Sequence, residues 1–170
     1  MTVLVRKFSD LLNRVTELAL VPIVLFFAGI LIVSVFSRYI FQLPIVSSIE
    51  MTRIAFVWAC FLGAASGTKR GAHVRVVAFV SLLPASLRRW TPFIVHGAFL
   101  AFAGLMIWHG IKLTGQMAAT SFPTLGISQG WLYLVLPVTG GLIAVHAVSG
   151  LLSGTPVDHD LSAEIEEIVR

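Results

Sequence analysis

The run LALVPIVLFFAGILIVSVFS, residues 18–37, decides the fold class of this chain. It holds 20 residues without a charged side chain, between Glu17 and Arg38. An α-helix rises about 1.5 Å per residue, so about 20 apolar residues cross the ~30 Å hydrocarbon core of a bilayer. No small-residue cleavage site followed by polar sequence ends the run, so it is predicted to stay in the mature protein as a transmembrane helix.

The composition of the whole chain extends this prediction. Apolar residues make up 57% of the 170 residues and charged residues only 12%, whereas a soluble domain has about 25% charged residues. The charges bracket further apolar blocks, which excludes a soluble fold and predicts an all-α integral membrane protein with four transmembrane helices. The predicted spans, within one domain of residues 18–152, are 18–37, 50–68, 92–111 and 131–152.

Shorter amphipathic segments are expected around this domain. Residues 1–17 place apolar side chains on one helical face and charged ones on the other, which is typical of a helix at the membrane interface. Residues 76–87 are uncharged but too short to cross, so they are predicted to form a short interfacial helix or a bent linker. Residues 153–170 are predicted to be a cytosolic tail.

Basic residues between the second and third spans predict the orientation. The net charge of +4 does not indicate a nucleic-acid partner, because the Lys and Arg side chains stand between apolar runs and not along one face. Short loops rich in Lys and Arg remain in the cytosol and contact membrane lipids, which predicts that both termini are cytosolic. The residues of this loop expected to set topology or contact lipid are Lys69, Arg70, His73, Arg75, Arg88 and Arg89.

The second span carries a ridge of small residues four positions apart: Ala55, Ala59, Gly63 and Gly67. Small residues let helix backbones approach closely in lipid, so the ridge is predicted to pack on another helix, either of this chain or of a partner. Trp58 on the same helix offers a large flat surface for a helix interface, with a lipid-facing or bundle-packing role as the alternative.

Glu50 and Arg53 stand at the start of the second span. Residues three apart are neighbours on a helix surface, so the two side chains are expected either to form an intrahelical ion pair or to face the polar groups of a partner. Both interpretations remain open at this point.

Catalytic signatures are absent from the sequence, which has no G-x-S-x-G, H-E-x-x-H, P-loop or dinucleotide fingerprint. The chain is therefore not expected to be an enzyme or to hold a metal or other cofactor. One alternative uses His96 and His146, which both fall near the cytosolic side and would serve as axial haem ligands in a small membrane anchor of a redox complex. The single cysteine, Cys60, excludes an intramolecular disulfide.

Two neighbouring segments resemble a known family. They are RYIFQLP, residues 38–44, and SSIEMTRIAFVWACFLGAASGTKRGAHVR, residues 47–75. The first matches an R-Y-x-F-x-x-P pattern, and the second an acid three before an arginine, then F-V-W-x-x-F-L-G-A-A, a basic pair and H-x-R. Together they resemble the small membrane subunit of tripartite ATP-independent periplasmic (TRAP) transporters. The matching residues are Arg38, Tyr39, Phe41, Pro44, Glu50, Arg53, Phe56 to Trp58, Phe61 to Ala65, Lys69, Arg70, His73 and Arg75.

The resemblance implies a scaffold subunit in a bacterial or archaeal inner membrane. Such a subunit assembles with a large permease subunit, which takes up an organic acid with the sodium gradient, and helps a periplasmic substrate-binding protein to dock. Arg38, Tyr39, Glu50 and Arg53 are then expected to form the partner interface at the periplasmic margin. The chain departs from the family at Ser47 and Ile49, where a tryptophan and a second acid are common, and at Val77, where an aspartate often stands.

Overall fold

A computed structural model describes the backbone of residues 2–80 and 91–153 and the side chains of residues 5–69 and 93–152. Helices make up nearly all of this part of the chain, which contains no β-strand apart from one isolated bridge. The helices are α1 (Thr2–Tyr39), α2 (Ser47–Val80), α4 (Thr91–Met117), the single turn α5 (Gly130–Tyr133) and α6 (Val135–Ser153).

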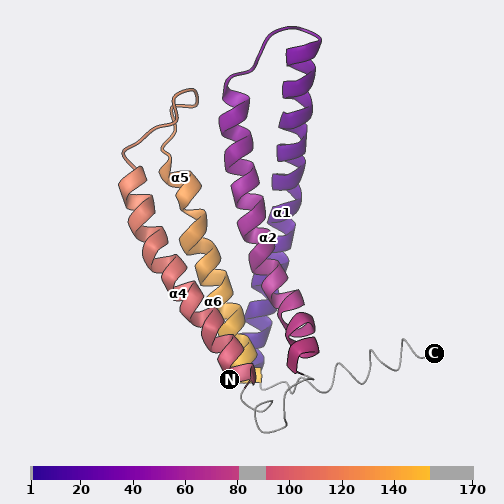
Figure 1. Ribbon diagram of the computed structural model, residues 1–170, viewed down its shortest axis with the longest axis vertical. Helices are drawn as coiled ribbons and strands as arrows, with labels where there is room; N and C mark the ends of the chain where they lie inside the picture. Colours follow the sequence, from indigo (N-terminus) through magenta and orange to yellow (C-terminus); the bar gives the residue numbers. More distant parts are fainter. Residues whose placement is uncertain (1, 81–90, 154–170) are drawn as a thin grey trace, which may run out of the picture.

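The long helices form two hairpins. α1 packs against α2, and α4 packs against α6, which also contacts α2 and α1. The hairpins lie close together at the end that carries the N-terminus and diverge toward the other end (Figure 1). We call these the terminal end and the loop end. The loop end carries the α1–α2 connection, residues 40–46, and the α4–α5 loop, residues 118–129.

Among the described residues, four helical segments are long and apolar enough to cross a membrane, and the last of them is formed by α5 and α6 together. These segments are Val5–Tyr39, Ser47–Lys69, Phe93–Met117 and Gly130–Leu152. The predicted fold class, an all-α membrane protein with four transmembrane helices, is confirmed. Its orientation stays a prediction.

Two helices extend beyond the spans expected from the sequence. α1 has 38 residues, or roughly 57 Å of helix, because residues 2–17 continue directly into the first span and do not form a separate helix. α2 continues to Val80, since no proline interrupts it before Pro84. The predicted interfacial segment 76–87 therefore overlaps the end of α2. Its residues from 81 on, and the tail from residue 154, lie outside the described residues.

The apolar core lies where α2, α4 and α6 meet. Ala65, Ala103 and Ile143 are buried there. α4 and α6 approach closely through two glycines: a Cβ added to Gly110 would lie 2.7 Å from Pro137 Cδ, and one added to Gly140 would lie 2.9 Å from Ile107 Cγ1. Small residues permit such close approach, which in lipid supplies the packing that holds helices together.

Candidate functional site

The R-Y-x-F-x-x-P segment ends α1 and turns the chain toward α2. The Leu43 N–H donates to the Ser37 carbonyl at 3.1 Å, while the Ser37 hydroxyl donates to the Leu43 carbonyl at 2.5 Å. Gln42 takes a left-handed conformation with φ of 54° between them. Beyond the turn, the hydroxyls of Ser34 and Ser48 are hydrogen-bonded at 2.9 Å, which ties α1 to the start of α2.

This turn leaves its most distinctive side chains on the surface. Arg38 is exposed, and Tyr39 is 78% exposed. The neighbouring large apolar side chains, Ile40, Phe41, Leu43 and Val46, are exposed as well. The α1–α2 connection therefore presents an uncovered edge at the loop end.

Glu50 lies in the first turn of α2 and contacts a segment far away in sequence. Its two carboxylate oxygens accept hydrogen bonds from the backbone N–H of Thr124, each at 3.2 Å. One of them also accepts from the N–H of Leu125 at 2.9 Å. Glu50 thus joins α2 to the α4–α5 loop and makes no ion pair with Arg53 among the described residues.

The α4–α5 loop has an ordered backbone of its own. Ser121 and Ser128 form an isolated antiparallel bridge, and the Phe122 N–H donates to the Ile127 carbonyl at 2.8 Å. Gly126, with φ of +67°, supplies the left-handed residue that closes the turn. Phe122 is only 3% exposed and anchors the loop against the bundle.

Trp58 makes a second connection, two turns further along α2. Its indole Nε1–H donates to the backbone carbonyl of Trp131 in α5 at 3.1 Å. The side chain predicted to lie at a helix interface is therefore half-buried and bonded across to the segment that follows the α4–α5 loop. Sequence reasoning missed these two contacts because neither joins residues at helical spacing.

Arg53 lies one turn from Glu50 but in a different environment. Its side chain is exposed, and none of the side chains that the structure describes pairs with the guanidinium. It shares the outward face of α2 with Ile49, Phe56 and Cys60, which are also exposed. A charge near the membrane is tolerated best when it is paired, so the expected contact of Arg53 with a partner protein stays a prediction.

The ridge of small residues runs from the interior of the bundle to its surface. Ala55 is buried and Ala59 half-buried, but Gly67 is exposed. A Cβ added to Gly63 or Gly67 would meet no atom within 4 Å. Along an i+4 row each step turns by about 40°, so the row rotates away from the bundle core. Contacts of its glycine end with a partner remain a prediction.

Polar contacts join α1, α2 and α6 at the terminal end. Lys69 pairs with Asp10 at 2.5 Å, and Ser66 donates to the carboxylate of Glu17 at 3.1 Å. Ser9 and His146, which are 2% and 7% exposed, share a hydrogen bond of 2.8 Å between Oγ and Nδ1. The sequence signal for this polar face is the i+4 spacing of Ser9, Asn13 and Glu17, all on one side of α1.

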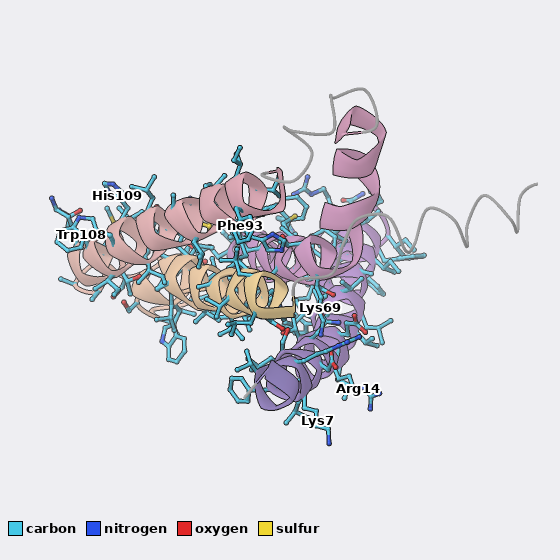
Figure 2. All side chains as sticks on the ribbon, turned by 90° about the horizontal axis from the view of Figure 1, so that it is seen from below. Lys7, Arg14, Lys69, Phe93, Trp108 and His109 are labelled. Carbon is cyan, nitrogen blue, oxygen red and sulfur yellow. The ribbon has the colours of Figure 1, made fainter. Side chains whose placement is uncertain are left out.

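Figure 2 shows Lys69 close to α1, whereas Lys7 and Arg14 of α1 point away from the bundle.

The other residues assigned to the basic loop are only partly described. Arg70, His73 and Arg75 lie in α2, but their side chains fall outside the described residues, as do Arg88 and Arg89 entirely. Their expected contacts with lipid headgroups stay a prediction.

The two histidines of the haem alternative are already engaged within the bundle. His146 is bonded to Ser9, and the ring of His96 lies directly against Gly150 of α6. A haem needs an open slot beside each axial ligand, and a histidine with 7% exposure does not border one. The arrangement does not fit the haem alternative.

Residues 27–156 match the family described as tripartite ATP-independent periplasmic transporters, DctQ component. The chain is 29% identical over 135 residues to the sialic acid TRAP transporter small permease protein SiaQ of Vibrio cholerae, covering 79% of this chain and 78% of that protein. It is 26% identical over 151 residues to a putative TRAP transporter small permease protein of Haemophilus influenzae, covering 88% and 93%.

A third similarity is to a longer protein. The chain is 31% identical over 105 residues to the isethionate TRAP transporter permease protein DctMQ of Oleidesulfovibrio alaskensis. The match covers 60% of this chain but only 16% of that protein.

Proposed function

The chain belongs to the DctQ family of TRAP transporter components, and from that premise we propose that it is the small scaffold subunit of a sodium-driven uptake system for an organic acid. The observation that carries this proposal is the family match over residues 27–156, which includes the last three of the four spans and the second part of the first, from residue 27 on. The family places the subunit in a bacterial inner membrane. No catalytic role is proposed.

The principal partner in this proposal is a large permease subunit. A segment similar to this chain makes up a small part of the much longer DctMQ permease protein, which supports a permanent association between the two kinds of subunit. The surface of α1 agrees: none of its most apolar 18-residue stretch is buried within the chain. Apolar surface on this scale is covered in a membrane by lipid or by a second subunit.

The loop end is proposed to face the periplasm and to help a soluble binding protein dock. The basic α2–α4 connection then lies in the cytosol, as the positive-inside rule requires. Arg38, Tyr39 and Arg53 are exposed at or near the loop end and are proposed to contact the binding protein or the junction with the large subunit. Glu50 is proposed to support the same surface indirectly, through its hydrogen bonds to the α4–α5 loop.

The proposed substrate class is an organic acid. The relatives are named for sialic acid and isethionate, which share an acidic group on a small organic skeleton. No residue of this chain is proposed to bind the substrate or the sodium ion.

Reconstitution tests this proposal. The chain is expressed with the large permease subunit from the same genome, and the purified pair is placed in liposomes with the cognate binding protein. Uptake of labelled sialic acid, isethionate and succinate is measured with an inward sodium gradient and with potassium in its place. We expect uptake of at least one of these acids only when both membrane subunits, the binding protein and sodium are present. Full uptake without this chain, or without sodium, would overturn the corresponding part of the proposal.

A further inference from the structure

We propose that Glu50 and Trp58 are positioning residues, which hold the α4–α5 loop in the position where it meets the binding protein. This inference rests on the proposed function and deepens it. It assigns the docking contact to the loop, residues 118–129, and gives Glu50 an indirect role in place of the direct contact expected from the sequence.

The hydrogen bonds of Glu50 carry the first step. Two consecutive backbone N–H groups, those of Thr124 and Leu125, point at one carboxylate, with donor–acceptor distances of 2.9–3.2 Å. Consecutive N–H groups form a concave site for an anion, and hydrogen bonds to an ionised acceptor are about twice as strong as neutral ones. The segment 113–157 has no charged residue, so the loop depends on α2 for this anion.

Hydrogen bonds within the loop hold it in shape, so a contact from α2 to one part of the loop positions the whole of it. Besides the bridge between Ser121 and Ser128, the Gln129 N–H donates to the Thr120 carbonyl at 2.7 Å, and the Ser128 hydroxyl donates to the Ala118 carbonyl at 2.8 Å. These bonds fix the shape of the loop but not its place relative to α2. The hydrogen bonds of Glu50 to the loop and of Trp58 to Trp131 tie the loop and α5 to α2, in addition to the buried side chain of Phe122.

The exposed surface of the loop suits a protein partner. Ser121, Pro123, Thr124 and Ile127 are exposed, uncharged and close together in the sequence. They stand at the loop end, which is also the end of the α1–α2 connection (Figure 1). A loop already held in shape loses little conformational entropy on binding, so its position controls affinity.

Hydrogen exchange in the purified complex with the large subunit tests the contact itself. In Glu50→Ala the amides of Thr124 and Leu125 lose their acceptor and should exchange roughly tenfold faster, with a smaller increase in Glu50→Gln. Lys112→Gln is the control, because Lys112 is an exposed cation of α4, lies outside residues 118–129 and is not assigned to the partner interface. Unchanged exchange in Glu50→Ala would overturn the assignment of Glu50 as the residue that holds the loop.

Uptake measured against the concentration of binding protein tests the consequence. We expect the half-saturating concentration of binding protein to rise roughly threefold or more in Glu50→Ala and in Trp58→Phe, which keeps the ring but loses the N–H donor. Maximal uptake and the yield of complex should stay near wild type, which separates positioning from assembly. Faster exchange without a change in the half-saturating concentration would overturn the proposal. Loss of the complex in both Glu50→Ala and Trp58→Phe would overturn it as well. If the wild-type complex shows no uptake that depends on binding protein, the proposed function fails instead, while the exchange result still decides the role of Glu50.

Discussion

At the scale of single residues, the two charges at the start of α2 have different surroundings. Glu50 faces the α4–α5 loop and is satisfied by backbone N–H groups of its own chain. Arg53 faces outward, without an ion pair to any described side chain. Three positions turn an α-helix by about 300°, so neighbours along the surface can still border different elements. The charge available to another molecule is therefore that of Arg53.

Charge reversal at Arg53 tests its availability to a partner. In Arg53→Glu the outward positive charge becomes negative, so an acidic partner group or a lipid phosphate would be repelled. We expect a lower yield of the complex with the large subunit, or weaker binding-protein-dependent uptake. Lys112→Glu is the control, because Lys112 is an exposed cation near the C-terminal end of α4 and is not assigned to the interface. Wild-type assembly and uptake in Arg53→Glu would remove Arg53 from the interface.

Gly110 tests the packing of α4 on α6. In Gly110→Ala the new Cβ would lie 2.7–2.9 Å from atoms of Pro137 and Leu136, closer than van der Waals contact. Overpacking of this kind costs about 1–3 kcal/mol, so the thermal midpoint in detergent should fall. Gly104→Ala on the same helix has open space around the new Cβ and should leave the midpoint unchanged. Equal midpoints for the two variants would contradict the close approach.

At the scale of helices, the polar contacts of the terminal end differ in their expected strength. The pair of Asp10 and Lys69 is partly exposed, with the Asp10 side chain 52% accessible, and exposed pairs contribute about 0–1 kcal/mol. The contact of Ser9 with His146 is buried, and its loss leaves a ring nitrogen unsatisfied. Interhelical hydrogen bonds in membrane proteins average about 0.6 kcal/mol and reach about 1.7 kcal/mol.

Paired substitutions measure that difference. We expect Ser9→Ala to lower the free energy of unfolding by about 1 kcal/mol or more, and Asp10→Asn by less than about 0.5 kcal/mol. Reversible unfolding in detergent micelles, with varied salt, provides the measurement. Added salt should reduce the effect of Asp10→Asn further but leave that of Ser9→Ala unchanged. The reverse ranking would mean that the buried contact does not hold α1 on α6.

A substitution at the glycine end of the α2 ridge can distinguish an effect on assembly from an effect on folding. Gly67 is exposed and has open space around its Cα, so Gly67→Leu should leave the stability of the isolated chain unchanged. If the ridge packs on the large subunit, the same variant should lower co-purification of the two subunits severalfold. Gly104→Leu, which adds the same side chain to an exposed site on α4, controls for bulk alone. Undiminished co-purification of Gly67→Leu would exclude this ridge from the interface.

The parts of the fold that follow helical periodicity could be predicted from the sequence, and the contacts between distant segments could not. Length and hydropathy were sufficient for four transmembrane helices, and the motif around Arg38 and Glu50 for the family. The partners of Glu50 lie 74 and 75 residues away, and that of Ser9 lies 137 residues away. Periodicity ranks neighbours on one helix only, so it offered Glu50 an ion pair with Arg53 or a contact with another protein, and it left the α4–α5 loop without a role.

At the scale of the whole molecule, α6 connects the two hairpins. It packs on α4 and contacts α1 and α2, while the loop end is bridged by side chains of α2 that reach the α4–α5 loop and α5. Polar contacts therefore join the two hairpins at both ends of the bundle. Between these ends, the apolar surface of α1 is not buried within the chain. A subunit built in this way supplies a fixed surface, which suits a scaffold.

The orientation of that scaffold is the prediction on which the proposed docking surface depends. With Cys60→Ala as background, single cysteines are placed at Thr120, exposed in the α4–α5 loop, and at Lys7, exposed near the start of α1. Intact cells are then treated with a maleimide that does not cross the inner membrane. Because the basic α2–α4 connection is expected to stay in the cytosol, Thr120→Cys should be labelled and Lys7→Cys should react only after the membrane is opened. Labelling of Lys7→Cys in intact cells would show the opposite orientation in the membrane. Arg38, Arg53 and the α4–α5 loop would then lie in the cytosol, where no periplasmic protein could reach them.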